Sequence, residues 1–404
     1  MKKKIMNKIY YGKAVYDNRE IKAVINVLKN QPLQLIDGKN VKKLEKKVCK
    51  LFGKKYGLMV NSGSSANLLA LASLNLKSGS EIITPNLTFS TTVAPIFQLG
   101  LVPHFIGVVD NKFVADQDQI EKCINKKTKA IVIPNLLGNI PEWKKISKIA
   151  KKYNLFVIED SADTIGYKIN NKNSGKFSDI VTNSFYASHI INGAGTGGIV
   201  CFNNFNLYQK AKLLRGWGRS SATFNESENI NKRFNTKIEG IDYDAKYVFS
   251  DLGYNFLPSE ISAAFALEQL KKLEKNISIR RKNFKVLKDF FSNYPDLIKV
   301  PHETKFLKTA WLAFPIVLKK NKIFNRKKFQ IFFEKSNIQT RTIFTGNILK
   351  QPVMKGRYYR KAKNIDIVAD DVMKNGVLLG CHQDMKMSEL DYICNTFKKF
   401  IAQA

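Results

Sequence analysis

The chain has 404 residues, of which 44% are hydrophobic and 25% charged, which allows one large domain and a smaller one with separate cores. Lys and Arg number 67 and Asp and Glu 33, giving a net charge of +34. The basic residues are spread along the chain in short pairs and form no basic tail, arginine-rich run or zinc finger. We therefore interpret the basic residues as a diffuse, solvated surface charge rather than as a nucleic-acid binding site. A positive surface would still help to attract anionic substrates.

No targeting or membrane segment is expected from the sequence. The segment from Met1 to Arg19 is basic, but no apolar run follows it, so it does not resemble a signal peptide. No stretch approaches the length of a membrane span, and we expect a cytoplasmic protein without membrane contacts. The five cysteines are widely spaced without a CxxC pair, which predicts neither a disulfide framework nor a zinc or iron–sulfur site.

Short apolar runs alternate with amphipathic stretches over residues 56–202. The expected strands are Tyr56–Val60, Glu81–Thr84, Ala130–Pro134, Leu155–Glu159, Val181–Phe185 and Gly198–Phe202. The expected helices between them are Leu68–Leu76, Thr92–Leu99 and Pro141–Tyr153. This alternation predicts the α/β class, with a mostly parallel sheet covered on both faces. Ligands of such a sheet bind outside the carboxyl ends of its strands.

The second half of the chain begins with a polar stretch, Arg219–Tyr247, which we expect to be a long loop. A helix is expected over Ser259–Lys275, and a basic helix continues towards Phe291. Strands such as Trp311–Leu318 then mix with helices. We therefore expect a large domain over residues 1–275 and a smaller α+β domain over residues 276–404.

Three motifs follow the expected strands. The run Asn61–Asn67 has glycine and small hydroxyls before a helix, where free N–H groups can bind an anion, although a plain N-cap has the same composition. The run Glu159–Asp163 places carboxylates at the end of a buried strand, where they need a partner: a protonated pyridine nitrogen, a metal or a helix cap. The run Ser184–His189 precedes the glycine-rich run Gly193–Gly198, which allows the backbone to return beside a ligand.

The order and spacing of these motifs resemble the DegT-type sugar aminotransferases, which have the aspartate-aminotransferase fold (fold type I). The resemblance covers nearly the whole chain, and the further matching stretches are Pro85–Phe89, Asn135–Asn139, Leu214–Arg219 and Leu252–Asn255. It implies a pyridoxal phosphate cofactor in the large domain and a homodimer with shared active sites.

The resemblance also implies a role for each matching residue. The residues expected to hold the cofactor phosphate are Gly63, Ser64, Ser65, Ser184 and, from the other subunit, Asn255. Those expected around the ring are Phe89 stacked on it, Asp160 at the pyridine nitrogen and Asp163 near the ring hydroxyl. The candidate substrate residues are Arg219, Arg341 and His382, and no metal ligand is expected.

The lysine that binds the cofactor covalently in this family is replaced. In the family this lysine lies eight residues before the first glycine of the Gly-Gly pair. In this chain that glycine is Gly197, and the residue eight positions before it is His189. The replacement resembles a subfamily, the 3-dehydratases of deoxysugar synthesis. Less specific similarities are Thr340–Phe344, Gly346–Asn347, Gly376–His382 and Asp163, where aminotransferases tend to carry Gln or His.

Histidine moves protons near neutral pH but cannot bind the cofactor as lysine does, so we expect non-covalent pyridoxal or pyridoxamine phosphate. The predicted reaction removes the C3 hydroxyl of an NDP-4-keto-6-deoxyhexose in deoxysugar synthesis of the lipopolysaccharide O-antigen type. His189 would take a proton from the C4′ carbon of the cofactor and return it to the leaving hydroxyl, with L-glutamate as the amino donor. Two alternatives stay open: an aminotransferase that tolerates histidine, and an inactive sugar-nucleotide-binding regulator.

One branch of the subfamily, which acts on a CDP-sugar, holds a two-iron cluster through cysteines in the loop after its Gly-Trp-Gly-Arg-like motif. The corresponding stretch Ser220–Tyr247 contains no cysteine. We therefore expect no iron–sulfur cluster and favour the branch that uses an amino-acid donor.

Overall fold

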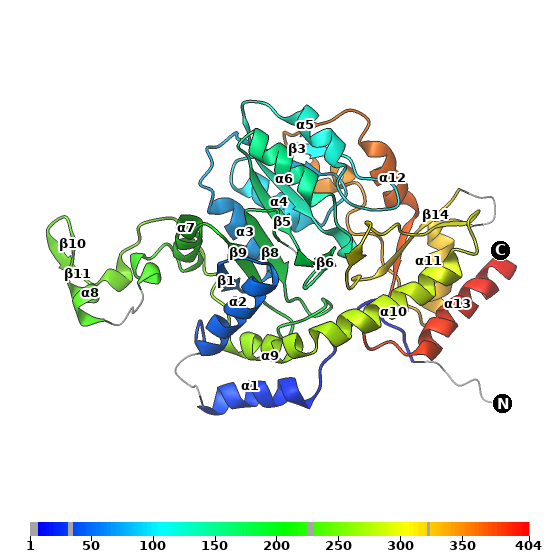
Figure 1. Ribbon diagram of the computed structural model, residues 1–404, viewed down its shortest axis with the longest axis horizontal. Coiled ribbons are helices and arrows are strands. Elements are labelled where there is room, and N and C mark those ends of the chain that lie inside the picture. Colours follow the sequence, from blue (N-terminus) through cyan, green and yellow to red (C-terminus); the bar gives the residue numbers. More distant parts are fainter. Residues whose placement is uncertain are drawn as a thin grey trace.

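The computed structural model describes residues 7–30, 35–170, 172–173, 175–224, 229–320 and 324–403. A central sheet lies between layers of helices, an arm extends to one side, and a smaller unit with the C-terminus lies on the other (Figure 1). The α/β class expected from the alternating pattern is the one observed.

Eight strands build the central sheet: β1 Tyr56–Val60, β2 Glu81–Pro85, β3 Val102–Ile106, β4 Thr128–Pro134, β5 Phe156–Asp160, β8 Ile180–Ser184, β9 Gly198–Phe202 and β15 Arg360–Lys361. Their order across the sheet is β1-β9-β8-β5-β4-β2-β3-β15. Only β9 runs against the others, since it is antiparallel to both β1 and β8. The six expected strands are all present, whereas β3 and β15 were not predicted.

The shorter strands are β6 Lys168–Ile169, β7 Lys172–Asn173, β10 Thr236–Ile238, β11 Ile241–Tyr243, β12 Ile298–Lys299, β13 Leu307–Lys308, β14 Phe314–Leu318 and β16 Gly376–Leu379. The helices are α1 Asn18–Asn30, α2 Lys39–Leu51, α3 Gly63–Ala72, α4 Ser90–Gln98, α5 Ile120–Cys123, α6 Trp143–Lys152, α7 Phe205–Arg215, α8 Ile230–Phe234, α9 Glu260–Lys271, α10 Leu273–Phe291, α11 Arg326–Lys335, α12 Asp366–Asn375 and α13 Met387–Ala402. The two successive helices expected from Ser259 to Phe291 are present as α9 and α10, but they separate at Lys272 rather than after Lys275.

Successive side chains of the central strands point to opposite faces, and each face is covered by helices. On one face, Met59, Val181 and Ile199 pack against α2 and α9, while Ile131 and Val157 pack against α6. On the other face, alternate residues of the same strands pack against α3, α4 and α7. Burial on both faces explains why these strands are almost continuously apolar.

The C-terminal unit is built on an antiparallel sheet of order β12-β14-β16. Helices α10, α11 and α13 cover this sheet with a core rich in phenylalanine, which includes Phe291, Phe314, Phe329 and Phe397. The N-terminal segment also reaches this core, because Ile9 bridges Ile338. The boundary between two domains at residue 275 stays a prediction.

The stretch Arg219–Tyr247 is not the plain loop expected from its polar composition. Its described part forms α8 and the hairpin of β10 and β11, which project away from the sheet (Figure 1). Glu239 and Gly240 turn the hairpin with φ of 49° and 86°, the left-handed conformation that tight hairpin turns require. Residues 225–228 of the expected loop lie outside the described residues.

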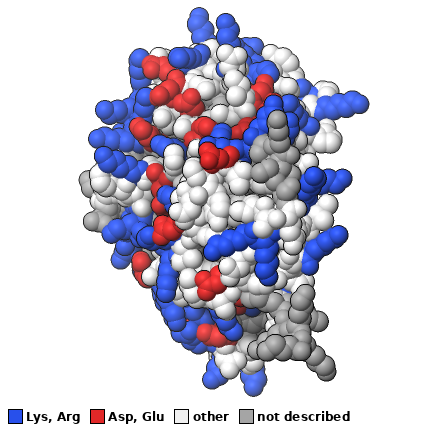
Figure 2. Space-filling model, turned by 90° about the vertical axis from the view of Figure 1, so that its right-hand side faces the viewer, with Lys and Arg blue, Asp and Glu red and all other residues white. Residues whose placement is uncertain are grey.

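Charge is distributed broadly over the surface. On the face shown in Figure 2, Lys and Arg side chains are spread over the visible surface rather than gathered in one stripe. None of the helices in the described ranges is both long and apolar enough to cross a bilayer.

Candidate active site

The carboxyl ends of the parallel strands open into a cavity of about 1050 Å³. Loops after β1, β2, β5 and β8 line it from the sheet side, and a segment of the C-terminal unit lines it from the other. Eight residues predicted from the sequence meet at this cavity: Gly63, Ser64, Phe89, Asp160, Asp163, Ser184, His189 and Arg341.

The N-terminus of α3 forms one wall of the cavity. Ser62 caps the helix, because its Oγ accepts the Ser65 backbone N–H at 3.0 Å. A Cβ on Gly63 would lie 2.5 Å from the Cβ of Ser184, so only glycine allows β8 to end this close to the helix. The free N–H groups of this turn and the Ser64 and Ser184 hydroxyls can hold a phosphate.

Asp160 ends β5 as a buried carboxylate on the cavity floor. Its Oδ2 accepts hydrogen bonds from Asn67 Nδ2 and Thr92 Oγ1, each at 2.8 Å, and its Oδ1 accepts one from the Ala162 N–H at 3.1 Å. Burial raises the pKa of Asp160, and these three donors oppose the rise. The carboxylate forms no ion pair with any described side chain, so it can receive a positively charged group from a ligand.

Asp163 is a second buried carboxyl in the cavity, and its Oδ2 accepts the Leu137 N–H at 2.8 Å. Burial raises the pKa of Asp163 to about 7, and the charge of Asp160 adds to the rise. The carboxyl can therefore be protonated near neutral pH and donate a hydrogen bond to a ligand.

His189 lies in the loop after β8, half-buried, with its imidazole on the cavity. Its Nδ1 is 3.3 Å from the Ser184 carbonyl oxygen. Burial lowers the pKa of His189 to about 4; the carbonyls of Ser184 and Ala162 oppose this shift, and the positive charge of Arg280 adds to it. A proton on Nδ1 donated to Ser184 leaves Nε2 unprotonated, so the ring is a neutral base at pH 7.

Aromatic and cationic side chains stand around the mouth of the cavity. Phe89 is half-exposed, and its ring meets that of Phe344 edge-on with 5.8 Å between centroids. The Arg341 guanidinium lies 6.0 Å from the centre of the Tyr11 ring, and both residues line the cavity. This side can hold an aromatic ring and an anionic group together.

Four predicted residues do not line the cavity within this chain: Ser65, Arg219, Asn255 and His382. Arg219 stacks on Trp217 at the base of the arm, 4.5 Å from the ring centre. Asn255 is exposed beside it, and its backbone bridges Gly216. His382 is buried, with Nε2 3.2 Å from the Tyr10 carbonyl oxygen. Contacts of these four residues with a ligand stay predictions.

Sequence reasoning missed several residues of the site. Asn67 and Thr92 bind Asp160 from α3 and α4, and Tyr11 and Phe344 reach the cavity from distant parts of the chain. Asn67 belongs to the Asn61–Asn67 motif, so its position could have suggested a role. Phe344 belongs to the stretch Thr340–Phe344, which could likewise have suggested a role, whereas nothing in the sequence distinguishes Tyr11.

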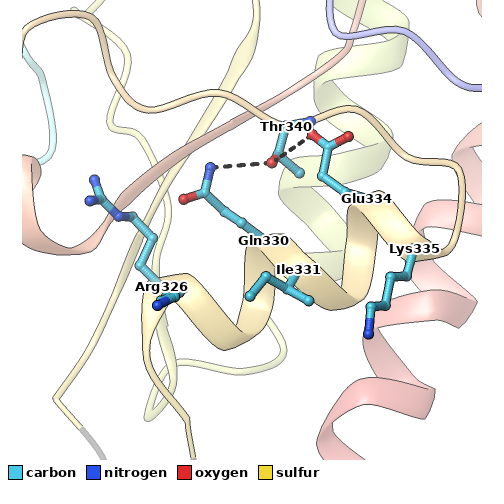
Figure 3. A pocket seen from close by; sticks show the side chains of 7 residues that line it. Arg326, Gln330, Ile331, Glu334, Lys335 and Thr340 are labelled. Carbon is cyan, nitrogen blue, oxygen red and sulfur yellow. Dashed lines mark hydrogen bonds between the residues drawn. The ribbon is translucent and has the colours of Figure 1, made fainter.

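A second hollow, of about 540 Å³, lies beside α11 in the C-terminal unit (Figure 3). The acidic side chain in this hollow, Glu334, already accepts two hydrogen bonds, one from the Thr340 N–H at 2.6 Å and one from the Thr340 hydroxyl at 3.2 Å. The hollow contains none of the predicted site residues, so we place the active site at the strand ends.

The strand-end cavity suits pyridoxal or pyridoxamine phosphate. It offers an anion-binding helix end, a half-exposed aromatic ring and a buried, ion-pair-free carboxylate for a protonated ring nitrogen. Among the described residues that line it there is no lysine. Elsewhere in the described ranges, no three His, Cys, Asp or Glu side chains come together as metal ligands.

A family model described as the DegT/DnrJ/EryC1/StrS aminotransferase family matches residues 15–398. The chain belongs to this family. The match confirms the family predicted from the three motifs, and the solved structures of its relatives confirm the pyridoxal-phosphate fold.

Among relatives of this DegT-family chain is dTDP-4-dehydro-2,6-dideoxy-D-glucose 3-dehydratase of Saccharopolyspora spinosa, 35% identical over 92% of this chain and 82% of the relative. GDP-4-keto-6-deoxy-D-mannose 3-dehydratase of Yersinia pseudotuberculosis is 33% identical over 98% of this chain and its whole length. A solved GDP-4-keto-6-deoxymannose-3-dehydratase with a trapped PLP–glutamate geminal diamine has a TM-score of 0.84 at 32% identity, covering 96% of this chain and 99% of that one.

The cofactor of this chain is expected to be removable without denaturation, because position 189 offers no amine. Borohydride treatment of the loaded protein, followed by digestion and mass spectrometry, should find no cofactor attached to a peptide. A His189→Lys variant is the positive control and should become labelled at residue 189. A stable adduct on a lysine of the wild-type chain would contradict the proposed site.

Proposed function

We propose that this chain is a 3-dehydratase that removes the C3 hydroxyl of an NDP-4-keto-6-deoxyhexose in deoxysugar synthesis of the lipopolysaccharide O-antigen type. The observation that carries the proposal is the position of the His189 imidazole on the cavity, where the family has its lysine, together with the buried Asp160. The likeness to two 3-dehydratases over most of the chain supports it. L-Glutamate is the proposed amino donor, and the trapped PLP–glutamate geminal diamine in the solved neighbour supports this choice.

When bound, pyridoxamine phosphate supplies an amine that condenses with the C4 ketone of the sugar and a ring that withdraws electrons. Gly63, Ser64 and Ser184 would hold its phosphate, and Phe89 would stack on its ring. Asp160 would hold the proton on the ring nitrogen, and Asp163 would donate a hydrogen bond to the ring hydroxyl. Arg341 would bind the anionic nucleotide part of the substrate at the mouth of the cavity.

His189 would move the proton that elimination requires. Its Nε2 would take a proton from the C4′ carbon and return it to the departing C3 hydroxyl, so that water leaves. The lowered pKa of His189 keeps the ring neutral before the first transfer. One imidazole can act first as a base and then as an acid, because the first transfer protonates the ring and the second returns it to the neutral form.

Product analysis tests the function directly. A panel of 4-keto-6-deoxy sugar nucleotides is incubated with the protein, cofactor and glutamate, and the products are identified by mass spectrometry. The expected product is a 3-deoxy ketone released together with ammonia. An amino sugar would instead identify an aminotransferase, and recovery of every substrate unchanged would identify a binding protein without this activity.

We further propose a homodimer in which each active site receives Asn255 from the other subunit. Asn255 is exposed and does not line the cavity of its own chain. Large apolar side chains are exposed nearby: Leu252 in the same segment at 93%, and Ile230 and Ile241 of the arm formed by α8, β10 and β11 at 71% and 66%. Apolar exposure of this extent is typical of a surface that a partner covers.

Hybrid dimers test this arrangement. A mixture of Asn255→Ala and His189→Ala chains, refolded together, should regain roughly one quarter of wild-type activity, because half of the dimers then contain one unmutated site. Each variant refolded alone is the control and should remain much less active. A mixture no more active than the mean of its parents would contradict the shared site, as would a fully active monomer in sedimentation.

A further inference from the structure

A buried guanidinium lies directly behind the loop that carries His189. Arg280 of α10 is fully buried, yet no described carboxylate forms an ion pair with it. Its Nε donates to Gln383 Oε1 at 2.7 Å, and its Nη1 donates to the carbonyl oxygens of Trp311 at 3.2 Å and Leu312 at 3.0 Å. A buried charge with only neutral acceptors is expensive, which distinguishes Arg280 from an ordinary ion-paired arginine.

The fourth contact of this guanidinium connects it to the proposed base. Nη2 reaches the Ser188 carbonyl oxygen at 3.5 Å, one residue before His189. Position 188 is also packed from the N-terminal segment, since a Cβ on Gly12 would lie 2.8 Å from Ser188 Cβ. The loop backbone is thus confined between α10 and the N-terminal segment.

The same guanidinium is linked to Asp163 through a chain of backbone hydrogen bonds. The Leu312 carbonyl accepts from Arg280, the Leu312 N–H donates to the Leu137 carbonyl at 2.9 Å, and the Leu137 N–H donates to Asp163 at 2.8 Å. Leu137 holds a φ of 60°, a strained conformation for a side chain of this kind. Arg280 therefore binds two backbone segments that line the cavity, the loop that carries His189 and the segment that carries Leu312.

We propose that Arg280 is a positioning residue for His189: its guanidinium joins the Ser188 carbonyl to the Trp311–Leu312 backbone, and it holds a positive charge behind the loop that carries the imidazole. The inference rests on the proposed role of His189 as the proton carrier. Arg280 does not line the cavity and acts through its neighbours.

The charges around His189 come from several elements. Arg280 approaches it from α10, and Tyr186 contacts it from its own loop. The other ionisable side chains that line the same cavity are Asp160 at the end of β5, Asp163 after it, Tyr11 and Arg341. Burial and the Arg280 charge lower the pKa of His189, whereas the Ser184 and Ala162 carbonyls raise it. Removal of the Arg280 charge alone should therefore raise the pKa of His189.

Nuclear magnetic resonance of the cofactor-free protein with ¹³Cε1-labelled histidine measures this effect without turnover. The chain has 4 histidines, and the His189→Asn variant assigns the signal. Arg280→Gln should shift the His189 titration upwards by at least about half a pH unit. Arg281→Gln removes the same charge from the adjacent, exposed position and should cause no shift. An unchanged midpoint in Arg280→Gln, or an equal shift in both variants, would overturn the proposal.

A second variant separates position from charge. Arg280→Lys keeps the charge but cannot bind all four acceptors, so the His189 titration should stay low while kcat falls at least about tenfold with little change in KM. In Arg280→Gln the acid limb of kcat should also move to higher pH, because the base becomes protonated earlier. Wild-type kcat in a folded Arg280→Lys protein would overturn the positioning role, even if Arg280→Gln fails to fold. If no 3-deoxy product ever forms, the proposed function fails, but the titration still tests the effect of Arg280 on the imidazole.

Discussion

Replacing His189 by asparagine is expected to slow C3 elimination by about 10²–10⁴-fold, or roughly 3–5 kcal/mol of transition-state stabilisation. Asparagine keeps a polar group of similar size and can still bond to the Ser184 carbonyl, but it cannot carry a proton near neutral pH. Cofactor binding should change little, because the helix end of α3, Phe89 and Asp160 form the rest of the site. Single-turnover release of the 3-deoxy ketone, together with the cofactor dissociation constant, measures both effects.

The matched control is His302→Asn, because His302 is exposed and does not line the cavity. It should dehydrate at the wild-type rate. His189→Lys should bind the cofactor covalently and shift the protein towards transamination. If His189→Asn eliminates water at an unchanged rate, another group is the base, and Asp163 and His382 would be the next to test.

Replacing Asp160 by asparagine is expected to have the second large effect. The amide fits the same space but carries no charge, so the ring nitrogen of the cofactor can no longer be held protonated. Truncating one partner of a buried, hydrogen-bonded charge pair typically costs about 2–5 kcal/mol, which corresponds to roughly a 30- to 5,000-fold loss. We expect this loss in kcat at saturating cofactor, with a change in the absorbance of the bound cofactor.

Asp163→Asn is the informative comparison for this prediction. It removes the other buried carboxyl of the cavity while leaving Asp160 and its three donors in place. The loss of rate should be smaller, because an amide can still donate a hydrogen bond to the ring hydroxyl. Equal losses in the two variants, or an unchanged cofactor spectrum in Asp160→Asn, would contradict the assignment of Asp160 to the ring nitrogen.

The central strands could be predicted because burial on both faces makes them short, continuous apolar runs. Strand β3 was not predicted, because Pro103 and His104 interrupt its apolar pattern. In the structure His104 is buried, and its Nδ1 lies 3.5 Å from Glu81 Oε2 without a hydrogen bond among the described residues, so its burial in a strand follows from packing that a local pattern does not show. The hairpin of β10 and β11 was missed although its Glu239–Gly240 turn carried a local signal.

The site was predicted most completely where its residues follow strands directly. Gly63, Asp160, Ser184 and His189 lie at strand ends, and parallel topology brings such ends to one edge of the sheet. Tyr11 reaches the cavity through packing of the N-terminal segment, which no local pattern reveals, and Phe344 reaches it from the C-terminal unit, where only the stretch Thr340–Phe344 was singled out. Asn255 and Arg219 lie at the base of the arm, outside the cavity of their own chain, and the contact proposed for Asn255 requires a second subunit.

The short strand β15 has a consequence for synthesis of the chain. Arg360 and Lys361 pair with His104 and Phe105 of β3, which would otherwise be the edge strand of the large sheet. The Arg360 guanidinium also lies 2.9 Å from a Glu81 carboxylate oxygen. A nascent chain therefore exposes β3 as an unpaired edge strand until residue 361 has left the ribosome. An unpaired edge strand can pair with strands of other molecules. Chains that end before residue 360 should therefore aggregate, although every other strand of the sheet is present. The two cationic side chains that close the border are themselves poor templates for further pairing, which keeps the finished protein dispersed.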